Sequence, residues 1–371
     1  MRTLKLGTSN LDVPVVAVGC MRINSLDRPE AERFVQAALD EGANFFDHAD
    51  IYGGGRCEEL FADAIGMNGT VREKIILQSK CGIRQGMFDF SKEHILASVD
   101  GILRRLRTDY LDVLLLHRPD TLVEPEEVAE AFDQLESSGK VRHFGVSNQH
   151  PRQIDLLKKY VRQPIVANQL QLSITNAGMI TSGFNVNMEN GAAIDRDGYI
   201  LDYCRLHDIT IQPWSPFQFG FFEGVFLDNP RFPELNAKID EVAANYGVSN
   251  TTIAIAWLLR HPARMQPVTG TMNIGRLKDC CKAAEVHLTR EEVVRHLPRG
   301  RQRPALTGAN PRGRARRQGS SPPQQTAKEP GGPDVPAAVG SNWPSSMRSR
   351  AGRRPLPSSV GNMPHVLYGF R

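Results

Sequence analysis

Short apolar runs alternate with longer amphipathic segments over about the first 290 residues of the chain. The short runs have the length and continuous apolar character of buried parallel strands. The longer segments repeat their apolar residues every three or four positions, as helices do. The strand-like runs are VVAVGC (15–20), FFDHAD (45–50), IILQSK (75–80), LDVLLLH (111–117), FGVSN (144–148), IVANQLQL (165–172), TIQPWSP (210–216) and QPVTG (266–270).

Eight successive strand–helix units predict a (β/α)8 TIM barrel, an α/β fold in which a ring of helices surrounds a closed parallel sheet. Residues 1–292 have an ordinary length for one such domain. The segment 2–14 precedes the first unit, and we expect it to form a hairpin that closes the barrel floor. Near the end of the domain, Thr289 and Glu292 have the spacing of a capping box, which predicts that a helix begins there.

Three consecutive strand-like runs end in residues with reactive side chains. Asp47 follows two phenylalanines, and Tyr52 lies in the next loop before three glycines; Lys80 and His117 end the next two runs. Each residue alone has an ordinary explanation, because Asp often caps turns and a core His is often simply hydrogen-bonded. The carboxyl ends of parallel strands meet at one rim of a barrel, so we predict that the four side chains share a site.

Several motifs around these residues, and others that follow in the same order, resemble the aldo-keto reductase family. The resemblance covers roughly residues 1–292 and is most similar to a bacterial branch of oxidoreductases. The motifs are DHADIYGG (47–54), SKCG (79–82), LLLHRPD (114–120), GKVRHFGVSN (139–148), NQLQLS (168–173), PWSP (213–216) and VTGTMNIGRLKDC (268–280).

The resemblance implies an NADPH-dependent oxidoreductase that reduces an aldehyde or ketone to an alcohol. Such a reaction needs a proton donor for the developing alkoxide, and a phenol with an ordinary pKa of about 10 is too weak an acid near neutrality. We therefore assign Tyr52 as the acid/base, with Lys80 lowering its pKa electrostatically. Asp47 is predicted to position Lys80, and His117 to orient the substrate carbonyl.

The resemblance also places a nicotinamide cofactor, although no GxGxxG motif of a Rossmann unit follows the first strand. It implies that NADP(H) is preferred, with NAD(H) as an alternative. Departures from the family pattern are Gly270 in place of a Lys, Cys280 in place of an Asn, and His48 in place of a Thr. The implied cofactor-binding residues are Ser147, Asn148 and Gln169 for the nicotinamide amide, Trp214 with Ser215 and Phe217 for its ring, Thr271, Asn273 and Arg276 for the 2′-phosphate, and Asp279 for the adenine.

The remaining composition limits the alternatives. The six cysteines have neither the spacing of a disulfide framework nor that of a zinc site, so free thiols and no metal are expected. No signal peptide or long apolar run is present, so we expect a cytoplasmic protein without a membrane partner. It is expected to be a monomer or a weak oligomer that binds a small carbonyl substrate.

Residues 293–371 differ sharply in composition from the preceding chain. They contain 14 of the 45 Lys and Arg residues but 2 of the 41 Asp and Glu residues, which gives a net charge of +12 against −8 for residues 1–292. The tail is rich in Pro, Gly, Ser and Arg without apolar periodicity, which predicts disorder. A nucleic-acid arm is the less favoured interpretation, because no aromatic interleaving or folded module accompanies the charge.

One permitted codon sequence for residues 293–307 suggests a different origin for this tail. Deleting its first base gives WYDIYRAAGNVLP followed by a stop, which is a plausible helix and ending for the family. We therefore hypothesise that the tail is an out-of-frame extension.

Two alternative functions stay open at this stage. The chain could be a nucleotide-binding regulatory barrel with little turnover, or an inactive product of an altered C-terminus. The substrate is not identified by any motif. We expect the loop 173–197 to shape the pocket mouth, with Met21, Phe217 and Phe219 as apolar walls.

Overall fold

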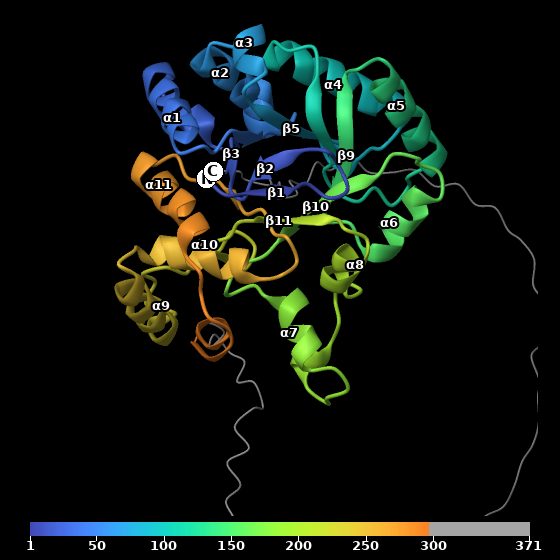
Figure 1. The fold of residues 1–371 in the computed structure, drawn as a ribbon. Helices are drawn as coiled ribbons and strands as arrows, with labels where there is room; N and C mark the ends of the chain where they lie inside the picture. Colours follow the sequence, from blue (N-terminus) through green and yellow to red (C-terminus); the bar gives the residue numbers. More distant parts are fainter. Residues whose placement is uncertain (297–371) are drawn as a thin grey trace, which may run out of the picture. The chain divides into compact units, whose positions relative to one another are not determined.

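Eight parallel strands close into a barrel, which confirms the predicted fold class (Figure 1). The computed structural model describes residues 1–296, and the predicted disordered tail falls almost entirely outside the described residues. Around the barrel the strand order is β10-β11-β14-β3-β4-β5-β8-β9. The strands are β3 (Ala17–Gly19), β4 (Phe45–Asp47), β5 (Ile76–Cys81), β8 (Leu111–Leu116), β9 (Val141–Ser147), β10 (Ile165–Gln171), β11 (Thr210–Trp214) and β14 (Val268–Thr269).

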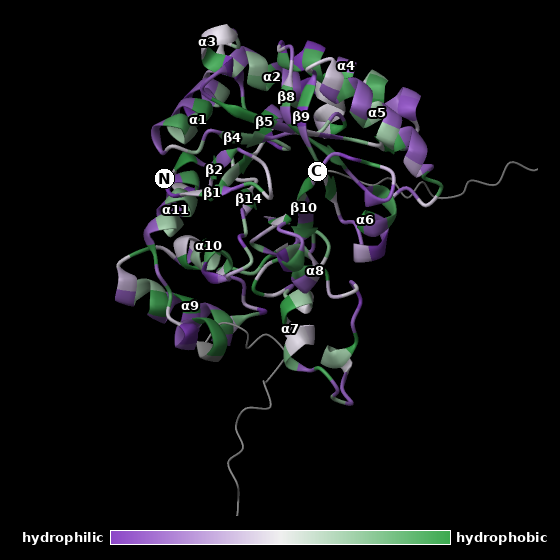
Figure 2. Ribbon diagram, turned by 45° about the vertical axis from the view of Figure 1, so that its right-hand side comes forward, coloured by the Kyte–Doolittle hydropathy of each residue, from purple (hydrophilic) through white to green (hydrophobic). Residues whose placement is uncertain are grey.

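Helices pack on the outside of this barrel with their apolar faces inward. In α1 (Arg28–Asp40) the buried residues Ala31, Phe34, Val35 and Ala38 follow the spacing of one helix face. The outer helices in Figure 2 accordingly alternate between hydrophobic and hydrophilic colours along their length. The other helices are α2 (Arg56–Ile65), α3 (Gly69–Arg72), α4 (Lys92–Leu106), α5 (Pro125–Ser137), α6 (Pro151–Lys158), α7 (Gly178–Phe184), α8 (Ile200–Leu206), α9 (Pro233–Tyr246), α10 (Asn250–Arg260) and α11 (Ile274–Lys282).

An N-terminal hairpin of β1 (Thr3–Lys5) and β2 (Asp12–Pro14) closes the end of the barrel where the strands begin, as predicted. Leu6 and Val13 are fully buried and pack in one cluster with Phe45, near the start of its strand. Gly7 has a φ of +56°, and a Cβ there would lie 2.4 Å from the carbonyl oxygen of Val166. A glycine is therefore required where the hairpin meets the barrel.

The predicted start of the last helix has the expected cap but a different continuation. The Thr289 hydroxyl accepts a hydrogen bond from the Glu292 amide at 3.2 Å, and the Glu292 carboxylate accepts one from the Thr289 amide at 2.7 Å. A π-helical turn, η5 (Glu292–His296), follows this capping box. The boundary that we place after residue 292 stays a prediction, because the chain that would define it lies mostly beyond the described part.

Two short hairpins and one longer segment lie in the loops that follow barrel strands. The hairpin β6 (Ile83–Arg84) with β7 (Met87–Phe88) follows β5, and β12 (Gln218–Phe219) with β13 (Gly224–Val225) follows β11. The predicted loop 173–197 contains α7 and the 3-10 turn η3 (Gly191–Ala193), and in Figure 1 α7 projects away from the barrel. The sequence did not predict this short helix, because the loop is long and rich in Gly and Asn. Among residues 1–296, no helix is long and apolar enough to cross a membrane.

Candidate active site

A fully buried ammonium group lies at the centre of the predicted site. Lys80 Nζ donates to the Asp47 carboxylate oxygens at 2.9 and 2.8 Å, and to the Tyr52 hydroxyl at 3.1 Å. It also donates to the main-chain oxygen of His48 at 2.7 Å. Burying an ammonium is costly unless oxygen atoms replace its water shell, and four oxygen contacts do so here. The structure therefore brings three of the four predicted side chains into direct contact.

Strand register explains how distant residues meet. Asp47 ends β4 and pairs with Gln78 of β5, and Lys80 lies two residues further along that strand on the same face. The main-chain amide of Asp50 then bonds to the Lys80 oxygen at 3.0 Å, which fixes the chain after β4. Asp47 and Lys80 are thus held at the carboxyl-terminal rim by backbone pairing.

The glycine run after Tyr52 shapes the loop that presents its phenol. Residues Tyr52–Gly55 form the 3-10 turn η2, in which Gly53, Gly54 and Gly55 all have positive φ. A Cβ at Gly55 would lie 2.7 Å from Cδ of Arg105. The turn therefore needs glycine both for its backbone conformation and for its close approach to α4.

His117 completes the group from the next strand. It follows β8, and its ring centroid lies 6.0 Å from that of Tyr52 with the two rings nearly perpendicular. Burial lowers the pKa of His117 well below its ordinary value, and the positive charges of Lys80 and Arg118 lower it further. The imidazole is therefore neutral at physiological pH, and a neutral imidazole has one N–H that can donate to a carbonyl oxygen.

The pKa of Tyr52 corrects one expectation. Burial raises this pKa above its ordinary value, and the nearby Asp47 charge raises it as well. Lys80 lowers it, as the sequence predicts, but does not outweigh burial. For Lys80 the balance is reversed: burial lowers its pKa, yet Asp47 and Tyr52 outweigh burial and leave the pKa raised, so the ammonium keeps its proton. The sequence could not reveal this burial, because it shows which charges are near but not how much water is excluded.

His48, the departure beside Asp47, does not join the site through its side chain. Its imidazole is buried edge-on against Phe61, with ring centroids 4.6 Å apart. Burial, followed by the charge of Lys80, lowers its pKa to about 3, so the ring is neutral. Its contribution to the site is the main-chain oxygen that accepts from Lys80.

The residues implied for the nicotinamide lie together at the ends of β9, β10 and β11. The Asn148 amide donates to Ser147 Oγ at 2.8 Å, and the Trp214 indole donates to Asn148 Oδ1 at 3.0 Å. Ser147 Oγ in turn donates to the main-chain oxygen of Gln169 at 3.0 Å. The Gln169 side chain donates to Asp47 Oδ1 at 3.1 Å, which connects this group directly to the Lys80 site.

The residues that flank Trp214 lie in the turn and the hairpin that follow β11. Ser215 has a φ of +53° in the turn after β11, and Phe217 is half-buried behind it. Phe219 is almost fully buried, and its ring centroid lies 5.0 Å from that of Phe232. Two aromatics that sequence reasoning missed, Phe221 and Phe222, are exposed beside Trp214 at centroid distances of 6.3 and 6.0 Å. They lie in the turn between β12 and β13, and no periodic pattern in the sequence predicted this hairpin.

The residues implied for the distal end of the cofactor surround the start of α11. Asn273 caps this helix by accepting from the Arg276 amide at 2.9 Å, and Thr271 accepts from the Asn273 amide at 3.2 Å. The Arg276 side chain is exposed, and Asp279 lies one turn further along the helix. A cation that the sequence did not suggest, Arg22, donates to the Gly270 oxygen at 3.3 Å. These two residues are 248 positions apart, so only the closed barrel places them together.

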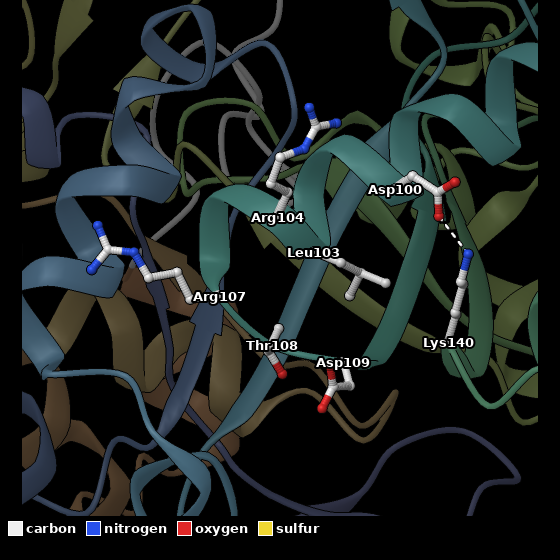
Figure 3. Close-up of a pocket in the computed structure, with 7 residues that line it drawn as sticks. All are labelled: Asp100, Leu103, Arg104, Arg107, Thr108, Asp109 and Lys140. Atoms are coloured by element: carbon white, nitrogen blue, oxygen red, sulfur yellow. Dashed lines mark hydrogen bonds and ion pairs between the residues drawn. The ribbon is translucent and has the colours of Figure 1, made fainter.

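An open surface depression lies at the other end of the strands. Figure 3 shows that the last turns of α4, the loop that follows it and Lys140 contribute its lining. Lys140 forms an ion pair with Asp100 at 2.6 Å across it. This depression lies near the starts of β8 and β9 and is separate from the group around Lys80. In residues 1–296, no cluster of three or more His, Cys, Asp or Glu side chains has a geometry that could hold a metal ion.

Comparisons with known proteins agree with this architecture. The sequence model of the Aldo/keto reductase family matches residues 15–296. The chain is 36% identical to "Uncharacterized oxidoreductase YcsN" of Bacillus subtilis over 75% of this chain and 91% of that protein. It is 33% identical to "6-dehydroglucose reductase" of Agrobacterium fabrum over 69% of this chain and 83% of that protein. The solved structure of the thermostable aldo-keto reductase Tm1743 covers 80% of this chain and 99% of its own, with a TM-score of 0.65 and 25% identity.

Proposed function

The chain belongs to the aldo/keto reductase family, an oxidoreductase family that uses nicotinamide cofactors, and from that premise we propose its reaction in detail. We propose that it reduces an aldehyde or ketone to an alcohol with Tyr52 as the proton donor. The contact of the Tyr52 hydroxyl with Lys80 Nζ is the observation that supports this proposal most strongly.

The proton-transfer step follows from these contacts. When bound, the reduced nicotinamide supplies the hydride that adds to the carbonyl carbon. As the carbonyl oxygen gains negative charge, the Tyr52 O–H bond breaks and its proton forms the alcohol hydroxyl. Lys80 stabilises the phenolate that is left, and Asp47 holds Lys80 in position. His117, as a neutral donor, orients the carbonyl oxygen toward Tyr52.

The residues near the site fit a nicotinamide chemically. A carboxamide needs both donors and acceptors, and Ser147, Asn148 and Gln169 supply a hydroxyl and two amides at adjacent strand ends. Asn148 and Ser215 adopt positive φ, a backbone conformation that non-glycine residues seldom take outside functional or turn positions. The indole of Trp214 offers an aromatic face beside them for the ring.

We assign NADPH as the preferred cofactor. Arg276 at the start of α11 and Arg22 beside Gly270 supply two guanidinium groups for a 2′-phosphate. Gly270 stands where the family pattern has a lysine. Arg22 therefore supplies the positive charge that this lysine would provide. The exposed aromatics Phe221 and Phe222 suit a substrate with an apolar or sugar-like face. The name of the Agrobacterium relative supports including sugar carbonyls among the substrates to test.

The Tyr52→Phe variant tests the proton donor. It removes the hydroxyl and keeps the ring, so we expect kcat for carbonyl reduction to fall by roughly a hundredfold or more while NADPH still binds. Tyr203→Phe is the matched control, because that hydroxyl bonds to Asp155 away from the site. Reductase activity in Tyr52→Phe close to that of wild type, with cofactor binding intact, would refute the assignment.

A further inference from the structure

Four glutamine side chains occupy the interior of the barrel beside the catalytic group. Gln78, Gln169 and Gln212 come from β5, β10 and β11, and Gln266 lies just before β14. All four are at most 4% exposed. Barrel interiors are usually filled by branched apolar residues, and a buried amide is costly unless its donors and acceptors are satisfied. A layer of amide side chains in the barrel interior is therefore unusual.

Gln78 and Gln212 form a reciprocal amide pair. The Gln78 amide donates to Gln212 Oε1 at 2.9 Å, and the Gln212 amide donates back to Gln78 Oε1 at 3.0 Å. Gln212 also donates to Gln266 Oε1 at 2.9 Å, and Gln266 donates to the Pro14 oxygen of the floor hairpin at 2.8 Å. These contacts leave each amide with a fixed orientation, since an exchange of its oxygen and nitrogen would break several bonds.

The second N–H of Gln78 points at the catalytic carboxylate. It donates to Asp47 Oδ1 at 2.6 Å, the shortest of the three contacts that this oxygen receives. The other two come from Lys80 and from Gln169, which is also the candidate partner of the nicotinamide. Gln78 is fully buried beneath the site, and its main-chain oxygen accepts from the His48 amide at 2.8 Å. Unlike Gln169, it is a neutral donor to Asp47 that is not also a candidate partner of the nicotinamide.

We propose that Gln78 is a positioning residue for proton transfer, which fixes the Asp47 carboxylate and, through it, the Lys80–Tyr52 pair. The inference rests on the proposed function, because it acts through Tyr52 as the donor. Gln212 locks Gln78 in the orientation that presents its N–H to Asp47. This assigns a role in the reaction to a residue at the core of the barrel that itself touches neither substrate nor cofactor.

Loss of the Gln78 contact changes the charge balance around the phenol in a defined direction. The groups that face Tyr52 are Lys80 from β5, Asp47 from β4, His117 after β8 and the Cys20 thiol after β3. Without the Gln78 donor, the Asp47 charge is less neutralised and holds Lys80 more strongly. Both changes raise the pKa of Tyr52, and a phenol with a higher pKa is a weaker acid.

The test compares pH profiles of kcat for carbonyl reduction in wild type, Gln78→Met and Gln266→Met. Methionine keeps the length of glutamine but removes its polar atoms. For Gln78→Met we expect a fall in kcat of roughly tenfold, a basic limb moved upward by about half a pH unit or more, and a KM for NADPH changed less than about twofold. Gln266→Met is the matched control within the same network, because it removes an equally buried amide that contacts Gln212 but not Asp47. Its basic limb should stay in place.

The pH profiles decide whether Gln78 positions the Asp47 carboxylate. A basic limb that stays in place in Gln78→Met, or one that moves equally in Gln266→Met, overturns the inference. If Gln78→Met does not fold, as judged by circular dichroism, Gln212→Met replaces it. That variant removes the oxygen that accepts from the Gln78 and Gln169 amides at 2.9 and 3.3 Å, while every group that contacts Asp47 is kept. It must move the limb in the same direction. Tyr52→Phe, run in parallel, separates the two claims: if it stays active, the proposed function fails, whatever the glutamine variants do.

Discussion

At the scale of single residues, burial dominates the pKa values of Tyr52, His48 and His117, whereas at Lys80 the neighbouring charges outweigh burial. Lys80 stays charged in the interior because oxygen atoms surround it, whereas His48 and His117 are neutral because burial lowers their pKa. The sequence predicted the four catalytic candidates, because each ends or follows a strand-like run. It did not predict Gln78 or Gln212, because a lone glutamine in an apolar run has no signature until the strands that face it are known.

Asp50 provides a pH prediction at this scale. Burial, and then the charge of Glu58, raises the pKa of Asp50 from 3.8 to about 7. The folded protein therefore holds this proton more tightly than the unfolded chain, so the free energy of unfolding falls as pH rises from about 4 to 7 and changes little above that. Asp50→Asn removes this dependence. We expect its melting temperature, relative to wild type, to be higher at pH 8 than at pH 5.

The matched control is Asp100→Asn, whose carboxylate is 53% exposed. It should change the melting temperature by a similar amount at the two pH values. An Asp50→Asn variant with the same difference from wild type at pH 5 and pH 8 would show that Asp50 does not titrate in this range.

Cofactor preference is the second prediction at residue scale. Arg276→Ala should raise the KM for NADPH about tenfold or more, because a charge-assisted contact to phosphate is lost, and NADH lacks that phosphate. Arg22→Ala should act in the same direction if its guanidinium shares the 2′-phosphate. The measurement is KM for both cofactors with one carbonyl substrate. Equal effects on NADPH and NADH would refute a phosphate-specific role for either arginine.

At the scale of elements, the sequence pattern predicted the barrel strands but not the short elements that lie in the loops between them. The alternation of apolar runs and amphipathic segments predicted all eight strands, since strand and helix periods differ clearly. It did not predict α7 or the hairpin of β12 and β13, because these elements are short and have little periodicity. The contact of Arg22 with Gly270 was also missed, because it joins the first and last units of the barrel.

The glycine turn η2 gives a matched pair of variants. Gly54 and Gly55 both have positive φ, so an alanine at either position strains the backbone by about 1 kcal/mol. A Cβ at Gly54 meets no atom within 4 Å, whereas at Gly55 it meets Arg105, which bonds to the buried Glu58 at 2.6 Å. We therefore expect Gly55→Ala to lower kcat several-fold more than Gly54→Ala, because the loop that carries Tyr52 must shift. Equal kcat values in the two variants would contradict this reading of the turn.

At the scale of the whole molecule, residues 1–296 contain every candidate catalytic and cofactor-binding residue. We propose that the catalytic domain is the barrel and that its boundary lies near residue 292. The prediction of a disordered, out-of-frame tail concerns residues that the structure does not describe, so it stays a hypothesis. Re-sequencing the coding region around codon 293 tests the sequence-error form of it.

We expect this barrel to turn over a carbonyl substrate instead of only binding a nucleotide. The most direct test is the consumption of NADPH and NADH by the full chain with a panel of aldehydes, ketones and sugar carbonyls, with the alcohol product quantified. We expect NADPH to be consumed in a one-to-one ratio with alcohol, and faster than NADH. Tight NADPH binding with no consumption against any carbonyl in the panel would contradict the proposed reductase function and favour a regulatory barrel.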